Sequence, residues 1–343
     1  MKEKKATIYD VAKFAGVSTA TVSRVLNHPE QVRLGTRQHI YDAMKQCSFN
    51  QKRSYQMSSQ LKQSVSKSKC FLLCIPTIHN PFYSDIVEGA TSAAANHGHH
   101  LLVDTLSITT INIDAFLFML KSYQIDGIIL MLALPDAILT KLYQNIPLVQ
   151  CSEYNEAFTD ISYVSIDDTS AEYKATEYAL STGHQKIAFI TSILGNHYAN
   201  RRYMGLQRAL NNASIHLRPD WVIQLQKIDF SLAYNAALKL LSNPDHPDAI
   251  LTVSDTFAAA CIRAAMHLGI KIHQDLIVIG FDNTDITTLC SPTITTISQP
   301  RFQLGYAAFE MLLHEIEFPQ ADKQQLLLPT ELIIRESTIG SPN

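Results

Sequence analysis

Four residues near the N-terminus combine one arginine with three short side chains: Thr19, Ala20, Ser23 and Arg24. An arginine can donate two parallel hydrogen bonds to the edge of a guanine, which discriminates between bases by roughly 1–3 kcal/mol. Short side chains let a helix approach the bases closely, and the methyl group of threonine or alanine can pack on a thymine methyl. This combination predicts base reading in the major groove of DNA. A surface salt bridge is the alternative role for Arg24, and the sequence leaves it open.

Hydroxyl, phenol and amide side chains surround these four residues. They suit contacts with phosphate groups, and they are Thr7, Tyr9, Ser18, Thr21, Ser23 and Asn27. Phosphate contacts fix the register of a protein on a duplex without reading its sequence. Thr7 and Ser18 also suit helix N-caps, and the two roles can coexist.

Three short helices over residues 7–48 would position these side chains. Thr7, Ser18 and Thr36 are the expected N-caps, and Gly16 separates the first two helices by a tight turn. Apolar residues recur at helical spacing, at Ile8, Val11, Ala12, Ala15, Val22, Val25, Leu26, Ile40, Ala43, Met44 and Cys47. The first two helices have the spacing of a helix-turn-helix motif, whose second helix enters the major groove.

The basic residues are concentrated in the N-terminal part of the chain. Residues 1–69 contain 13 lysines and arginines against 4 acidic residues, a net charge of +9. The remaining residues contain 15 against 27, a net charge of −12, so the whole chain carries −3. No acidic residue occurs between Asp42 and Asp85. Only the N-terminal part is expected to meet a polyanion, with a solvated basic tail as the alternative.

From Cys70 onward, short apolar runs alternate with amphipathic stretches. Strands are predicted at CFLLCIP, LLVDT, GIILM, PLVQC, YVSID, KIAFIT, WVIQL, AILTV, LIVIG, TTIS and ELIIRES. Helices are predicted up to His97, through Phe116, up to Gly183 and over 199–211, 231–242, 255–268 and 303–316. This alternation predicts parallel sheets covered by helices on both faces. Because about 270 residues are long for one such sheet, two lobes are expected.

Several classes of protein are disfavoured by what the sequence lacks. It has no run of about 18 apolar residues and no apolar segment or cleavage site at its start, so a cytoplasmic location and no membrane contact are expected. The six cysteines form no CxxC pair and are expected to be free thiols. No GxSxG, GxxxxGK[ST] or HExxH motif occurs, so no enzyme, metal site or cofactor is expected.

The stretch TIYDVAKFAGVSTATVSRVLN resembles the head of the LacI/GalR family of bacterial repressors. Further resemblances run to the C-terminus and cover about nine-tenths of the chain: NPFYSDIVEGA, YVSIDD, GHQKIAFI, RRYMGLQRAL, VSDTFAAACIRAA, DLIVIGFDNTDI, TTISQPRFQLGYAAFEMLL and ELIIREST. Within the family, STATVSR, AANHG, IGFDN, QPR and ELIIR are most similar to the cytidine-type branch.

The resemblance implies a small all-α helix-turn-helix head joined to an α/β periplasmic-binding-protein-like domain of two lobes, with two parallel sheets and three crossovers. The head would span residues 1–49, a hinge or linker 50–69, and the effector-binding and dimerisation domain 70–343. Lobe one would comprise about 70–165 and 299–330, and lobe two about 166–298 and 331–343.

The hinge departs from the family pattern. Members continue into a Tyr-x-Pro…Ala-Arg-Ser-Leu helix whose leucine wedges into the minor groove of DNA. Here Phe49 lacks the following proline, and residues 50–69 are polar, basic and rich in serine and glutamine. Leu61 is the candidate wedge, with Met57 second. A tether that never becomes helical is the alternative.

The resemblance also implies a ligand between the lobes. Asp282 and Arg202 match the family's hydroxyl-binding carboxylate and ligand-gripping arginine. The expected aromatic contacts are Phe82, Tyr83 and Phe230, and the positions expected to vary with the ligand are Asn196 and Tyr198. The alternatives are a helix cap for Asp282, a surface salt bridge for Arg202 and plain core for the aromatic residues.

These observations predict a transcriptional regulator that acts as a repressor. It would bind a pseudo-palindromic operator in double-stranded DNA as a homodimer. A nucleoside effector is favoured over a sugar or a purine. A ligand-binding protein without a role on DNA is a distant alternative, and a protein that only bundles DNA would need no sensor lobes. The effector, the direction of its effect, the operator and the regulated genes are not readable from the sequence.

Overall fold

The computed structural model describes the backbone of residues 8–18, 21–22, 25, 32, 34–46, 68–105 and 112–340. The chain divides into two compact units, a head before Lys69 and a body from Lys69 onward.

In the head, the first helix and the turn after it follow the sequence pattern. Helix α1 spans Ile8–Phe14, and Gly16 follows at φ +62° in the left-handed region that glycine tolerates best. The backbone N–H of Thr21 donates to the side-chain oxygen of Ser18 at 3.1 Å, and the N–H of Val22 donates to the Ser18 carbonyl. Ser18 therefore caps the second helical segment, as predicted.

Helix α3 spans Leu34–Gln46, so it begins two residues before Thr36 and the predicted N-cap at Thr36 is wrong. The core of the head follows the predicted spacing. Its buried residues are Val11, Ala12, Ala15, Val22, Val25, Ile40 and Ala43. Because these side chains come from three helical segments, their burial fixes how the segments pack.

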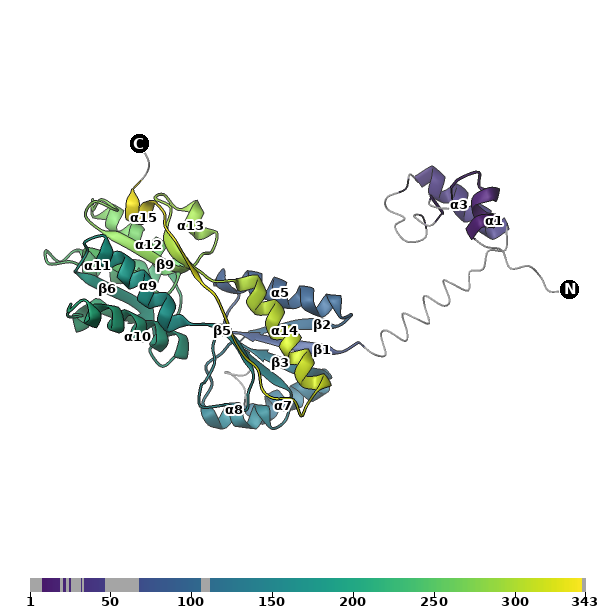
Figure 1. Cartoon of the computed structure of the whole chain (residues 1–343), viewed down its shortest axis with the longest axis horizontal. Coiled ribbons are helices and arrows are strands. Elements are labelled where there is room, and N and C mark those ends of the chain that lie inside the picture. Colours follow the sequence, from purple (N-terminus) through teal and green to yellow (C-terminus); the bar gives the residue numbers. More distant parts are fainter. Residues whose placement is uncertain are drawn as a thin grey trace. The chain divides into compact units, whose positions relative to one another are not determined.

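The body contains two six-stranded sheets (Figure 1). The first sheet has the order β11-β5-β4-β3-β1-β2, with β1 Cys70–Ile75, β2 His100–Thr105, β3 Ile125–Leu130, β4 Leu148–Cys151, β5 Tyr163–Ile166 and β11 Gln325–Leu328. The second has the order β12-β10-β9-β8-β6-β7, with β6 Ile187–Ser192, β7 Val222–Leu225, β8 Ala249–Thr252, β9 Ile277–Asp282, β10 Thr295–Ser298 and β12 Glu331–Ile333.

The chain passes between the sheets three times, after β5, after β10 and after β11. The predicted two-lobed fold with three crossovers is thus confirmed. Parallel pairing holds throughout except between β10 and β12, where Thr296 pairs with Ile333 in antiparallel register. The expectation of two parallel sheets is corrected at that edge, because β12 enters directly from a short crossover.

Helices cover both faces of each sheet. Lobe one, built on the first sheet, carries α5 Phe82–Asn96, α7 Ile113–Ser122, α8 Asp136–Tyr143 and α14 Arg301–Glu317. Lobe two, built on the second, carries α9 Asp168–Ser181, α10 His197–Asn212, α11 Phe230–Leu241, α12 Asp255–His267 and the short α13 Ile286–Leu289, η2 Pro219–Trp221 and α15 Glu336–Ile339. Among the described residues, no helix is long and apolar enough to cross a membrane.

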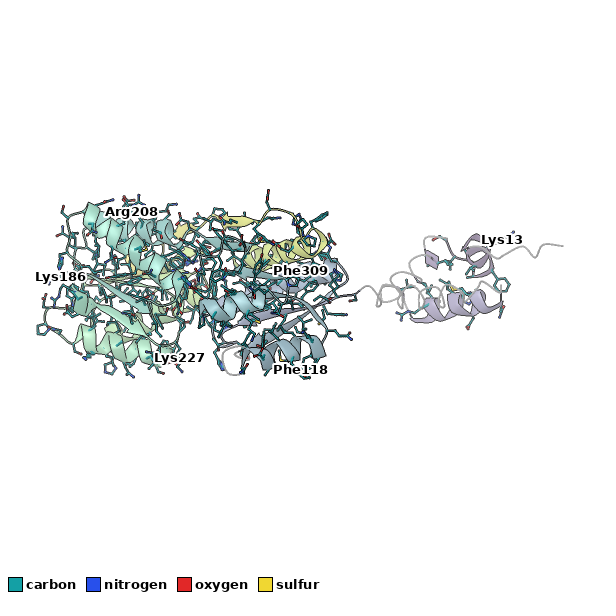
Figure 2. All side chains as sticks on the ribbon, turned by 90° about the horizontal axis from the view of Figure 1, so that it is seen from below. Lys13, Phe118, Lys186, Arg208, Lys227 and Phe309 are labelled. Carbon is teal, nitrogen blue, oxygen red and sulfur yellow. The ribbon has the colours of Figure 1, made fainter. Side chains whose placement is uncertain are left out.

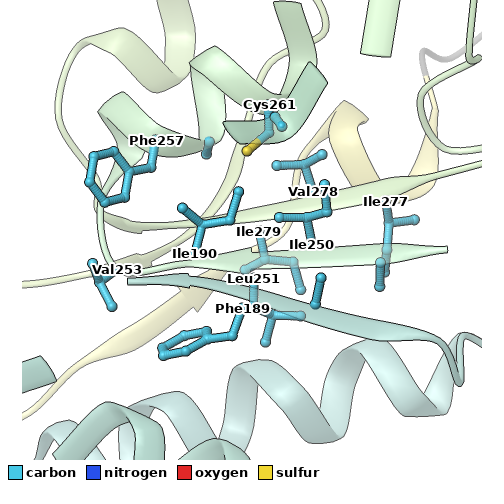
Figure 3. Close-up of a cluster of buried hydrophobic side chains, with 14 of the residues drawn as sticks. Phe189, Ile190, Ile250, Leu251, Val253, Phe257, Cys261, Ile277, Val278 and Ile279 are labelled. Atoms are coloured by element: carbon cyan, nitrogen blue, oxygen red, sulfur yellow. The ribbon is translucent and has the colours of Figure 1, made fainter. Parts of the chain in front are cut away.

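The core of lobe two lies on both faces of its central strands. Phe257 and Cys261 of α12 pack on one face, while Phe189 of β6 points to the other (Figure 3). Successive residues of a strand face opposite sides, so the apolar runs predicted from the sequence supply both layers. This two-sided burial holds the carboxyl ends of the strands in place.

In lobe one, two glycines let α5 and α14 approach closely. A β-carbon on Gly89 would lie 2.0 Å from the carbonyl oxygen of Phe302, and one on Gly305 would lie 1.9 Å from that of Ile86. No side chain fits at either position. This contact fixes the position of Phe82 and Tyr83 at the start of α5.

Candidate functional site

A cavity of about 540 Å³ lies between the lobes at the carboxyl ends of their strands. Such crevices are where open α/β sheets bind ligands, and the volume is that of a small-molecule site. Lobe one contributes residues after β1, β3 and β4. Lobe two contributes the end of β9 and residues after β6, β7 and β8.

Arg202 on α10 is almost completely buried. Its Nε donates to Asp168 Oδ1 at 2.8 Å and its Nη1 donates to the Val253 carbonyl at 2.8 Å. The guanidinium carbon lies 3.5 Å from the centre of the Phe281 ring. The guanidinium is therefore fixed in orientation before any ligand arrives. The alternative of a surface salt bridge does not hold, because the ion pair with Asp168 is internal.

Asp282 ends β9 in a conformation rare for a residue with a side chain, at φ +110°. Its Oδ1 accepts a hydrogen bond from Gln299 Nε2 at 2.7 Å. Burial raises the pKa of Asp282 well above its usual range, against the Arg202 charge, which lowers it. The structure makes Asp285 the N-cap residue of α13. Asp282 is therefore not a cap, and its strained backbone is of the kind that gathers at binding sites.

The start of α10 adds neutral polar groups to the side of the cavity that lobe two forms. The hydroxyl of Tyr198 donates to Ser192 Oγ at 2.8 Å, and Asn196 Nδ2 donates to the same oxygen at 3.3 Å. The Tyr198 ring lies 5.0 Å from the guanidinium carbon of Arg202. Lys227 and Asp229, paired at 2.9 Å, lie further out, and Figure 2 shows Lys227 at the edge of lobe two that faces lobe one.

Lobe one presents an aromatic pair. The rings of Phe82 and Tyr83 meet edge to face at 5.2 Å. The side chain of Asn80 accepts a hydrogen bond from the backbone N–H of Phe82 at 3.1 Å, which fixes the start of α5. Met131, Leu132 and Ala133 follow β3 and extend the apolar surface.

Lobe one contributes one carboxylate to the cavity, that of Glu153. Glu153 follows β4 and accepts hydrogen bonds from the backbone N–H groups of His197 and Tyr198 at 2.8 and 3.2 Å. Burial raises the pKa of Glu153 to about 7, while these two hydrogen bonds and the Arg201 charge lower it. The residue lines the cavity and also touches α10 of the other lobe.

Six of the seven effector residues expected from the sequence line this cavity: Phe82, Tyr83, Asn196, Tyr198, Arg202 and Asp282. Phe230 does not. Its ring is 41% exposed and lies nearly parallel to that of Tyr234, on the same helix. Its neighbour Asp229 is the cavity residue and caps α11 by accepting from the N–H of Leu232. The N-cap residue Asp229 therefore faces the cavity, whereas Phe230, the first residue of the helix, faces solvent.

Sequence reasoning missed Glu153 and Asp168. Glu153 lies in SEYN, which has neither periodicity nor a motif. Asp168 follows the predicted strand YVSID, and an acidic residue after a buried strand was a usable signal. Among the described residues, no three His, Cys, Asp or Glu side chains are grouped to hold a metal ion.

Of the predicted DNA contacts, only Ser18 and Thr21 are fully described, and their hydroxyl oxygens lie 2.8 Å apart. The backbone of Tyr9 is part of α1. The other predicted contacts lie outside the described residues: Thr7, Thr19, Ala20, Ser23, Arg24, Asn27 and Leu61, with its alternative Met57.

Two family models match the chain in the order of its two units. Residues 7–51 match the model described as "Bacterial regulatory proteins, lacI family", and residues 176–338 match that of a "Periplasmic binding protein-like domain". The "HTH-type transcriptional repressor CytR" of Escherichia coli (strain K12) is 32% identical over 348 residues and covers 100% of both chains. The "HTH-type transcriptional repressor PurR" of Photorhabdus laumondii is 33% identical over 344 residues and covers 98% of both.

Solved structures show the same architecture. The "transcriptional regulator CelR-cellobiose complex" has a TM-score of 0.72 at 25% identity and covers 97% of this chain and 100% of that one. The transcription regulator CcpA of Lactococcus lactis has a TM-score of 0.72 at 26% identity and covers 79% of this chain and 99% of that one.

Proposed function

Because the chain belongs to the lacI family of bacterial regulatory proteins, it is a DNA-binding transcriptional regulator, and we propose that it is a repressor controlled by a nucleoside in the interlobe cavity. The observation that supports this proposal most directly is the preoriented pair of Arg202 and Asp282 opposite the aromatic residues Phe82 and Tyr83. Aromatic faces bury a flat ring, and a carboxylate with a guanidinium satisfies hydroxyl groups in fixed directions.

The charges of the cavity favour a ligand without a phosphate group. Three carboxyl groups line it, on Glu153, Asp229 and Asp282. Of its two cationic side chains, Arg202 is paired with Asp168 and Lys227 with Asp229. A phosphate bound here would lie beside three carboxyl groups, and both cationic side chains that line the cavity already have an acidic partner. The resemblance of the sequence motifs to the cytidine-type branch supports a nucleoside, and the regulator found with cellobiose supports a sugar as the second candidate.

The DNA-reading assignment rests on the head. We infer that Ser18 and Thr21 contact phosphates and that Thr19, Ala20 and Arg24 read bases, as the matched family model supports. The protein acts as a dimer on its operator, and we propose a cytoplasmic location because DNA is its partner.

The test begins with selection of duplexes from a random-sequence DNA pool by the purified full-length protein. Binding of the selected duplex is then measured by fluorescence anisotropy with cytidine, adenosine, inosine, their monophosphates, free bases and sugars. We expect one nucleoside to change operator affinity by about 5- to 150-fold, which corresponds to a coupling of 1–3 kcal/mol. A selection that recovers no common sequence would contradict the regulator assignment, and a response only to sugars would replace the nucleoside.

Arg24→Ala tests the reading head separately. We expect the variant to lose about 5- to 150-fold in preference for the selected duplex over a scrambled one, because the bidentate contact with guanine is gone. Its thermal shift with the effector should equal that of the wild type. Retained preference would mean that another residue reads the operator.

A further inference from the structure

The helix that brings Tyr198 and Arg202 to the cavity is capped by the opposite lobe. Asn196, the N-cap residue of α10, makes no side-chain capping bond, and its amide Nδ2 donates to Ser192 Oγ. The N–H groups of His197 and Tyr198 donate to the two carboxyl oxygens of Glu153, which follows β4 in lobe one. Since the first N–H groups of a helix have no partner within it, Glu153 supplies the cap that α10 lacks.

A strained turn presents Glu153 to the helix. Ser152 has φ +64°, which is unfavourable for a residue with a side chain. Its backbone is held from both sides, because its N–H donates to the Val164 carbonyl at 2.8 Å and its carbonyl accepts from Ser165 Oγ at 2.9 Å. Strand β5 therefore fixes the direction in which Glu153 projects.

The next residue makes a second contact with the same helix. Arg201 Nη1 donates to the carbonyl of Tyr154 at 3.3 Å, and its guanidinium carbon lies 3.9 Å from the centre of the Tyr154 ring. The ring in turn stacks on that of Tyr163 in β5 at 4.0 Å. Two adjacent residues of lobe one thus engage one face of α10.

Given the ligand-responsive cavity proposed above, we propose that Glu153 is an interlobe positioning residue that holds α10 against lobe one and thereby stabilises the closed form of the cavity. Because Tyr198 and Arg202 are on the same helix, contact with the effector and engagement of Glu153 change together. The residue thus links occupancy of the cavity to the angle between the lobes.

Closure should then take up a proton. In an open form Glu153 would face water and titrate near its usual 4.5, whereas in the closed form burial raises its pKa to about 7. A carboxyl group with a raised pKa favours the closed form at low pH, and that advantage is lost as the pH rises through 7. Effector binding that requires closure should therefore be about tenfold tighter at pH 6 than at pH 8.

The contribution of Glu153 to the pH dependence has to be distinguished from that of neighbouring groups. The charged or titratable groups that face it are Arg201 and Tyr198 of α10, Asp168 of α9 and Tyr83 of α5. His197 also carries an imidazole, whose pKa burial lowers. His197→Gln keeps the backbone N–H and should keep the pH dependence, whereas Glu153→Gln should remove it.

The first experiment needs no effector. Amide hydrogen exchange of the full-length protein is measured at fixed pH with residue-level resolution at the start of α10. In Glu153→Ala, we expect exchange at His197 and Tyr198 to accelerate at least about tenfold, because Glu153 is the partner of both N–H groups within the described part of the chain. The matched control is Glu156→Gln, whose carboxylate is exposed and only 3.8 Å from Arg201. Unchanged exchange in Glu153→Ala would overturn the proposal.

The second experiment uses whichever nucleoside shifts the melting temperature of the wild type most. Calorimetry at pH 6, 7 and 8 should show about tenfold weaker binding by Glu153→Ala at pH 7 and a flat pH profile for Glu153→Gln. If Glu153→Gln keeps the pH dependence of the wild type, another group takes up the proton on closure, and the proposed coupling between Glu153 and effector binding is wrong. If no nucleoside binds, the proposed effector fails, whereas the exchange experiment still decides the role of Glu153.

Discussion

The two walls of the interlobe cavity are built from different chemistry. Lobe two contributes four charged side chains, Arg202, Lys227, Asp229 and Asp282, and the innermost two are buried and bonded to protein partners. Lobe one contributes an aromatic pair and a short apolar segment after β3, and its one carboxylate, Glu153, is directed at lobe two.

This difference indicates that lobe two orients the ligand and lobe one buries it. Fixed charges can orient a ligand only where their own geometry is held, and lobe two achieves this with the internal pair of Arg202 and Asp168. Apolar surface has no directional requirement, so lobe one can bury the ligand on closure and exclude water. We therefore expect substitutions in lobe two to change stability or recognition, and substitutions in lobe one to change affinity more gently.

The largest effect is expected from Arg202→Ala. Removing one partner of a buried ion pair leaves the other charge poorly compensated, which typically costs about 3–5 kcal/mol. Urea unfolding followed by the single tryptophan, Trp221, reports this in lobe two. Arg208→Ala is the matched control on the same helix, where the side chain is exposed on the outer side of lobe two (Figure 2). If Arg202→Ala and the wild type unfold at the same urea concentration, the buried pair of Arg202 and Asp168 does not stabilise lobe two.

Asp282→Ala should have the next largest effect, on recognition. Loss of a hydrogen bond that a ligand hydroxyl group donates to this carboxyl group costs about 1.5–3 kcal/mol, or roughly 10- to 150-fold in effector affinity. Operator binding without effector should be unchanged. Asp285→Ala, three residues further and exposed, provides the control by calorimetry. An effector response equal to that of the wild type would mean that the ligand is oriented elsewhere.

Tyr83→Leu should have the smallest effect. It keeps an apolar side chain but removes the ring, and aromatic pairs contribute about 0.5–1.5 kcal/mol beyond the burial of their area. We expect effector affinity to fall about two- to tenfold in titrations, with Tyr123→Leu at a 66% exposed position as the control. A loss as large as that of Asp282→Ala would show that lobe one also orients the ligand, and the division of roles would fail.

The sequence predicted the alternation of strands and helices well, because buried parallel strands are apolar along their whole length. It missed elements without that signal. Strand β11 lies at the edge of its sheet, with Leu326 39% and Leu327 46% exposed, and α8 is only eight residues long. Helix α7 extends to Ser122, beyond the Phe116 expected, since the apolar residues continue through FLFML.

The site was predictable where a side chain follows a predicted strand or matches the family pattern, as for Asp282 and Arg202. It was not predictable where the role depends on a partner far away in the sequence. Glu153 acquires its role only because α10 lacks a cap of its own, which no local pattern reveals. Phe230 does not line the cavity because it is the first residue of α11, one position after the N-cap Asp229, and one residue turns the side-chain direction on a helix by about 100°.

The last twenty residues have a consequence for how this protein can be altered. They add one edge strand to each sheet, β11 and then β12, within a span of nine positions (Figure 1). A premature stop before Gln325 would therefore damage both halves of the sensor at once, and neither half can be excised or exchanged by a single genetic cut. Viable chimaeras with related regulators should have their junctions near Lys69, where head and body divide.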